Sequence, residues 1–66
     1  MISNQMYEKS MALIYKDNKV VGWMSTDKEA DMFCEKHHAY SWDFYYPHKE
    51  YINLSKLIHM NLYSVN

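Results

Sequence analysis

The chain has 66 residues and a formal net charge of −1 at pH 7, and its apolar content is dominated by seven Tyr, two Trp and six Met. A chain of this length buries only about 60% of the surface that its unfolded form exposes, so it has room for one domain and excludes a two-domain enzyme. Because aliphatic residues are few, we expect a core of aromatic and thioether side chains whose polar tips need partners or water.

The sequence contains no stretch long enough to span a membrane, for which about eighteen or more consecutive apolar residues are needed. Its first nine residues lack the basic and apolar regions of a signal peptide. The single cysteine, Cys34, excludes an intramolecular disulfide, whereas small secreted domains usually depend on several. We therefore expect a cytoplasmic protein with no membrane partner.

All seven basic residues are lysines. Arginine supplies the bidentate contacts to phosphates and to guanine edges on which nucleic-acid readers depend, so nucleic acid is not expected as the main partner. Lysine in place of arginine, together with five asparagines, is also typical of AT-rich coding. In so short a chain this favours a phage or a mobile element as the source.

Residues 1–10 are polar and without periodicity, and we interpret them as a loosely ordered N-terminal arm before a single domain of residues 11–66. The domain begins with two apolar runs, 11–15 and 20–24, on either side of Asp17 and Asn18. Both of these residue types tolerate left-handed backbone angles. The segment therefore predicts a β-hairpin with a two-residue loop.

Both faces of the predicted hairpin are apolar. A two-residue loop would place Leu13 opposite Gly22 and would put Ile14, Val21 and Trp23 on the other face. The glycine indicates a place where a large neighbour approaches the backbone closely. Because one helix can cover only one face, we expect the remaining face to be buried in a homodimer whose interface contains Ile14, Val21 and Trp23.

Thr26 and Glu29 stand at the spacing of a capping box, which predicts that a helix begins here and extends over about 27–38. Its apolar stripe repeats at helical spacing. The stripe consists of Ala30, Phe33, Cys34 and His37. We expect this helix to lie on the hairpin.

Segment 41–46 alternates as a strand, with Trp42, Phe44 and Tyr46 on one side and Asp43 and Tyr45 on the other. Segment 50–62 fits both a strand and a helix. After Asn53, which is suited to cap a helix, we favour a short strand near 50–52 followed by a helix over about 54–62. The expected fold is thus a small α+β domain in the order ββαβα.

Cys34, His37 and His38 lie near the end of the predicted helix at a spacing that could hold a metal, and His48 and His59 occur elsewhere. A lone cysteine at a core-facing position is more often a small buried hydrophobe. The single glycine of the chain also leaves no loop that could cradle phosphate. We therefore expect no metal, no cofactor and no catalytic residue, and keep a metal- or thiol-dependent regulatory factor as an alternative.

Segment 40–46 carries five aromatic rings in seven residues, and so short a chain has little interior for its eleven rings. One interpretation makes Trp42, Phe44 and Tyr46 the core and leaves only Tyr40 and Tyr45 outside. Because Tyr and Trp concentrate at interface hot spots, we favour a non-enzymatic protein-binding module that modulates or inhibits a partner protein. A small nucleic-acid-binding protein is the other alternative. The candidate partner-binding residues are Tyr40, Trp42, Tyr45 and Tyr51, with Asp31 and Glu35 on the acidic face of the helix.

Overall fold

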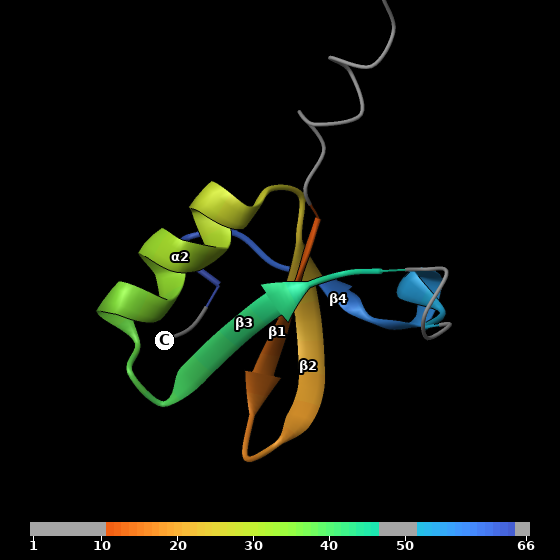
Figure 1. The fold of residues 1–66 in the computed structure, drawn as a ribbon, viewed down its shortest axis with the longest axis horizontal. Coiled ribbons are helices and arrows are strands. Elements are labelled where there is room, and N and C mark those ends of the chain that lie inside the picture. The colour runs from red at the N-terminus through yellow and green to blue at the C-terminus, as the bar shows by residue number, and fades with distance from the viewer. Residues whose placement is uncertain (1–10, 47–51, 65–66) are drawn as a thin grey trace, which may run out of the picture.

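The computed structural model describes residues 11–46 and 52–64 (Figure 1). Its elements are β1 (Ala12–Lys16), β2 (Lys19–Met24), α2 (Asp27–Lys36), β3 (Tyr40–Phe44), the 3-10 turn η1 (Leu54–Lys56) and β4 (Ile58–His59). The strands form one mixed sheet in the order β3-β1-β2-β4, and α2 packs against one face of it. The predicted α+β class is confirmed. The predicted N-terminal arm, residues 1–10, and the candidate residue Tyr51 lie outside the described residues.

The hairpin predicted from Asp17 and Asn18 is present between β1 and β2. Both residues adopt left-handed backbone angles, with φ of 55° and 66°. Asp and Asn populate this region more readily than other residues with a side chain, which is why a two-residue turn forms here. Among the described residues, no helix is long and apolar enough to cross a membrane.

The register of the hairpin shifts between Ile14 and Tyr15. Next to the turn the residues pair as predicted, but further along Ile14 pairs with Gly22 and Leu13 pairs with Trp23. A bulge of this kind adds one residue to one strand, and one residue is enough to exchange the two faces. The predicted pairing of Leu13 with Gly22 is therefore wrong, and Trp23 shares a face with Leu13.

Helix α2 begins where its capping residues predict. Thr26 is the N-cap, and its Oγ1 accepts a hydrogen bond from the Glu29 backbone N–H at 3.2 Å. The helix ends at Lys36, slightly earlier than predicted, and the His37 N–H closes its last turn by donating to the Phe33 carbonyl oxygen at 2.9 Å.

The core lies between α2 and the side of the sheet that we call the helix-covered face. Its buried residues come from β1, β2, α2 and the segment that follows β4, and partly buried aromatic and aliphatic side chains pack around them. The buried residues are Ala12, Ile14, Met24, Ala30, Phe33 and Met60. The predicted helical stripe is confirmed at Ala30 and Phe33, which are fully buried.

The C-terminal part departs from the sequence prediction. Asn53 does cap a helical turn, because its Oδ1 accepts from the Ser55 N–H at 3.1 Å, but η1 ends after three residues. Leu57 is already extended, and β4 then pairs in parallel with β2. The predicted helix over 54–62 is wrong beyond this single turn.

The segment after η1 is extended rather than helical because of a long-range contact, which the helical periodicity of the sequence cannot reveal. Met60 is buried against Gly22, and its N–H donates to the Trp23 carbonyl oxygen at 2.8 Å. A Cβ at position 22 would lie 2.5 Å from the Met60 Sδ and 2.9 Å from the Ile58 carbonyl oxygen. The close approach predicted at Gly22 is therefore present, and it holds the C-terminal segment extended along β2.

Candidate functional site

The side of the sheet turned away from α2, which we call the helix-free face, carries three aromatic side chains together with a leucine and an aspartate. The five residues are Leu13, Tyr15, Trp23, Asp43 and Tyr45. Leu13 pairs with Trp23 on one side and with Asp43 on the other, and alternate residues of a strand point to the same face. In the part of the chain that the structure describes, α2 is the only α-helix, and it packs against the opposite face.

Leu13 is only 4% exposed, although no helix among the described residues lies over it. Tyr15, Trp23 and Tyr45, its neighbours along and across the strands, are each half-buried. The Tyr45 hydroxyl donates to the Ile52 carbonyl oxygen at 3.2 Å, which ties the ring to the segment before η1. The helix-free face is therefore an aromatic rim around a buried leucine, with part of each ring open to solvent.

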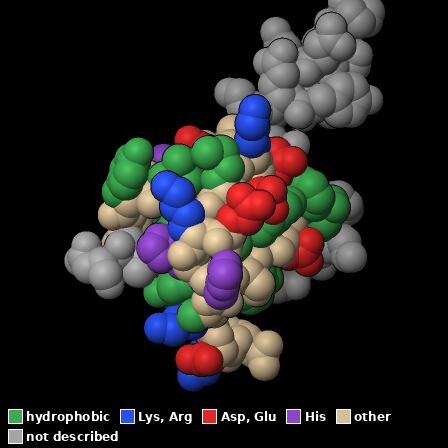
Figure 2. All heavy atoms as spheres, turned by 90° about the vertical axis from the view of Figure 1, so that its left-hand side faces the viewer, with side chains coloured by type: hydrophobic (Ala, Val, Ile, Leu, Met, Phe, Trp, Pro, Cys, Tyr) green, Lys and Arg blue, Asp and Glu red, His purple; other side chains and the backbone are tan. Residues whose placement is uncertain are grey.

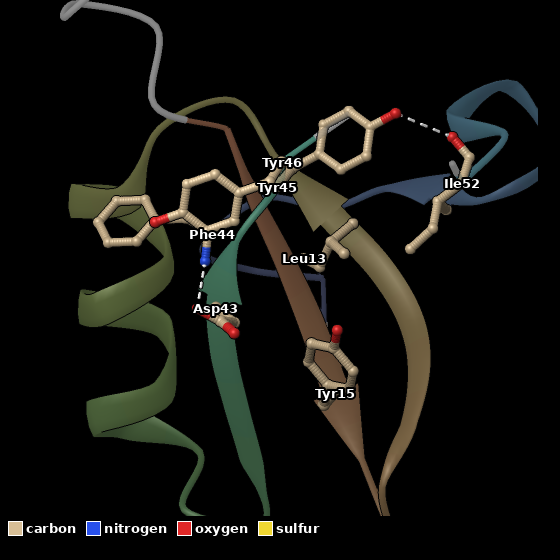
Figure 3. A pocket seen from close by; sticks show the side chains of 7 residues that line it. All are labelled: Leu13, Tyr15, Asp43, Phe44, Tyr45, Tyr46 and Ile52. Atoms are coloured by element: carbon tan, nitrogen blue, oxygen red, sulfur yellow. Dashed lines mark hydrogen bonds between the residues drawn. The ribbon is translucent and has the colours of Figure 1, made fainter. Parts of the chain in front are cut away.

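A cavity of about 100 Å³ opens on this face (Figure 3). Seven residues line it: Leu13, Tyr15, Asp43, Phe44, Tyr45, Tyr46 and Ile52. In Figure 3 the Leu13 side chain lies between those of Tyr15 and Tyr45, and the Tyr45 ring is directed towards Ile52. Pockets that bury small-molecule substrates measure about 300–1,000 Å³, so this cavity has the size for one side chain rather than for a substrate.

Asp43 is the one charged residue of the cavity lining, and its side chain is exposed. Its Oδ1 accepts a hydrogen bond from the Phe44 N–H at 2.7 Å, and no described residue forms an ion pair with it. The Tyr45 N–H donates to the carbonyl oxygen of Met11, the residue just before β1. Because successive N–H groups of a strand point in opposite directions, the Phe44 N–H points to the outer edge of β3. Asp43 thus occupies an edge N–H that could otherwise pair with another strand.

A second cluster joins β2 to β4. The Trp23 and His59 rings stack with centroids 4.1 Å apart and planes 9° apart, and the His59 Nε2 shares a hydrogen bond with the Ser25 Oγ at 2.9 Å. A Ser–His pair can act as nucleophile and base only beside a substrate site, and neither residue lines the cavity. The sequence reasoning missed this cluster because it depends on the parallel pairing of β4.

The structure divides the predicted aromatic site between the two faces. Tyr40 lies edge-on to Phe33 at 5.3 Å between centroids, and Trp42 packs against the core on the helix-covered face. The strand predicted over 41–46 spans Tyr40–Phe44, so Tyr45 follows its end. Tyr45 lines the cavity together with Leu13 and Asp43, on the side that alternation predicts. Tyr40, Trp42 and Tyr45 therefore do not form one surface.

Asp31 and Glu35 are exposed on α2. The same helix carries Lys28 and Lys36, and Figure 2, which looks at the side of the molecule where α2 lies, shows acidic, basic and histidine side chains interspersed. This face carries charges of both signs, and it is separated by the sheet from Tyr45.

The three residues predicted for a dimer interface are also separated. Ile14 is completely buried under α2, and Val21 packs against the same core. Trp23 lies on the opposite face because of the bulge. The structure thus leaves only Trp23 of the three on the helix-free face.

Cys34 and His37 pack beside the core rather than around a common point. Cys34 is half-buried, and the His37 ring lies 4.7 Å from the Phe33 ring. Burial, and to a smaller extent the Asp31 carboxylate, raise the pKa of the Cys34 thiol, which is the opposite of what a nucleophile needs. Within residues 11–46 and 52–64, no three His, Cys, Asp or Glu side chains come together as a metal site would require.

No protein-family model, curated protein or solved structure matches this chain. Its function has to be inferred from its own geometry, and the features that stand out are the aromatic rim of the helix-free face and the small cavity within it.

Proposed function

We propose that the protein is a small non-enzymatic binding module of the cytoplasm, which docks on a partner protein through its helix-free face and so modulates or inhibits that partner. The observation that carries this proposal is the half-buried position of Tyr15, Trp23 and Tyr45 around Leu13, on the side of the sheet away from α2. Tyrosine and tryptophan give large contact areas at low entropic cost and dominate binding energy at interfaces. A cavity with room for one side chain suits an anchor residue better than a substrate.

A second copy of the chain is the alternative occupant of this face. In a symmetric dimer the same patch would meet itself, so each Asp43 would face a surface identical to its own. The cavity lining contains no basic side chain that could compensate this carboxylate. A different protein can supply such a side chain, and for this reason we favour a different protein over the homodimer expected from the sequence.

The test is capture of the partner from a lysate of the source cells, with matched variants of the bait. Tyr45→Ala removes a ring of the helix-free face, whereas Tyr63→Ala removes an 81% exposed ring next to Leu62, which packs on the helix-covered side. Tyr45→Phe keeps the ring and removes only the hydrogen bond to Ile52. Thermal unfolding of each bait establishes that it is folded.

We expect the wild type, Tyr63→Ala and Tyr45→Phe to capture the same protein. Tyr45→Ala should weaken the binding by about 2 kcal/mol or more, which is the loss typical of a hot-spot ring. Equal capture by all four baits would refute the proposal. Sedimentation of the isolated protein tests the second copy: a dimer that Tyr45→Ala dissociates would assign the face to self-association.

A further inference from the structure

We propose that the cavity of the helix-free face holds the positively charged end of a lysine or arginine side chain of the partner protein. This inference rests on the proposed function and deepens it by giving the chemistry of the anchor residue. It follows from three observations: the lining of the cavity, the position of the Asp43 carboxylate, and the absence of a basic neighbour for that carboxylate among the described residues.

The lining combines aliphatic, aromatic and charged side chains. Leu13 and Ile52 supply aliphatic surface, Tyr15 and Tyr45 supply rings, and Asp43 supplies the carboxylate. Lysine and arginine have the matching shape, because an apolar stem of several methylene groups ends in a cation. A cation next to tyrosine rings is stabilised further by their negative faces.

The carboxylate is held in place before any ligand arrives. One oxygen of Asp43 accepts the Phe44 N–H at 2.7 Å, which fixes the side chain at the edge of β3. The nearest lysine in the strand register does not reach it, because the Lys16 ammonium lies over the Tyr40 ring, 5.3 Å from its centroid, at the end of β3 away from Phe44. Asp43 is thus an oriented negative charge that no basic side chain of the described residues compensates.

The other kinds of anchor fit less well. An acidic side chain would be repelled by Asp43. A purely apolar side chain would fill the cavity but would take the carboxylate out of water without giving it a partner, and burying an unpaired charge is costly. A volume of about 100 Å³ is suited to the end of one such side chain.

The experiment is a titration of the ¹⁵N-labelled protein, followed by NMR, with three blocked amino acids, two of them cationic and one uncharged. The probes are the Nα-acetyl methylamides of lysine, arginine and norleucine, the last being an uncharged analogue of the lysine stem. We expect saturable shifts of the Leu13, Asp43 and Tyr45 amides with the lysine and arginine probes, and no saturable shift with norleucine. Equal shifts with norleucine, shifts confined to other residues, or no shifts at all would overturn the inference.

Two matched variants separate the charge of Asp43 from its structural role. Asp43→Asn keeps an oxygen that can accept the Phe44 N–H and removes the charge, and Asp31→Asn removes an exposed carboxylate from α2. Because Asp43 is exposed, we expect Asp43→Asn to weaken binding of the lysine probe about two- to fivefold. Asp31→Asn should leave it unchanged. An equal affinity for the wild type and Asp43→Asn would contradict the inference.

The partner experiment distinguishes failure of this inference from failure of the proposed function. If Asp43→Asn captures the partner as well as the wild type does while Tyr45→Ala does not, the proposed function stands and the cationic anchor is refuted. If the lysine probe binds in the cavity but capture does not depend on Tyr45, the chemistry of the cavity is supported and the proposed function fails.

Discussion

Replacing Gly22 with alanine tests how closely β4 is held against β2. A Cβ at this position lies 2.5 Å from the Met60 Sδ, 2.7 Å from the Met60 Cγ and 2.9 Å from the Ile58 carbonyl oxygen. The thioether can rotate away, but the carbonyl belongs to the backbone, so β4 itself has to move. Overpacking of this kind costs about 1–3 kcal/mol. The alanine also restricts the unfolded chain, which contributes about 0.4–1 kcal/mol in the opposite direction, so overpacking is the larger effect.

We therefore expect Gly22→Ala to lower the free energy of unfolding by about 1–2 kcal/mol, which corresponds to a fall in Tm of about 4–16 °C for a domain of this size. Circular dichroism during thermal and urea unfolding measures both quantities. Ile58→Ala is the control, because this side chain is 68% exposed on the same strand and its loss should change stability by no more than about 0.5 kcal/mol.

A double variant identifies the atoms responsible. Met60→Ala alone creates a cavity and should cost about 2–5 kcal/mol. In the Gly22→Ala background it also removes the clash with the thioether, so the two losses should sum to more than the loss in the double variant. An unchanged or higher Tm for Gly22→Ala would refute the position of β4 against β2.

Three further predictions concern the thiol, the stacked tryptophan and nucleic acid. Burial and then Asp31 raise the pKa of Cys34, so Asp31→Asn should lower that pKa and speed alkylation by iodoacetamide at mildly alkaline pH; an unchanged rate would exclude the effect of the carboxylate. The Trp23 Nε1 is buried without a hydrogen-bond partner among the described residues, so Trp23→Phe should stay within about 1 kcal/mol of the wild type in urea unfolding, whereas Trp23→Ala should lose more than about 2 kcal/mol. Equal losses in the two variants would contradict this. Because the protein has no arginine and a net charge of −1, its binding to DNA or RNA, measured by fluorescence anisotropy, should be weak and should be lost steeply as salt rises. Submicromolar binding at physiological salt would contradict the preference for a protein partner over nucleic acid.

The elements that could be predicted from the sequence are those with local signals. The hairpin turn depends on the left-handed backbone of Asp17 and Asn18, which are neighbours in the chain. The start of α2 depends on Thr26 and Glu29, which lie within one helical turn of each other. The side of the sheet on which Tyr45 lies, directly after the end of β3, follows from simple alternation. In each case the physics acts over a few residues and can be read from them.

The parts that could not be predicted depend on single-residue shifts or on distant contacts. The bulge beside Ile14 leaves no mark in the hydrophobic pattern because both faces of the hairpin are apolar, yet it moves Trp23 to the face of Leu13. Strand β4 forms because Met60 fits over Gly22, a contact between segments far apart in the sequence. The helix-free face therefore contains two residues that alternation identified, Asp43 and Tyr45. Leu13, Tyr15 and Trp23 come to lie beside them only through the pairing of the strands in the sheet.

The measurement that tests the central claim most directly is hydroxyl-radical footprinting, read by mass spectrometry, of the protein alone and in complex with the captured partner. We predict that the partner protects Tyr15 and Tyr45. Met32, which is 40% exposed on α2, and Tyr63 should be labelled equally in both states. Protection of Met32 with unchanged labelling of Tyr15 and Tyr45 would place the partner on the helix side of the molecule and contradict docking through the helix-free face.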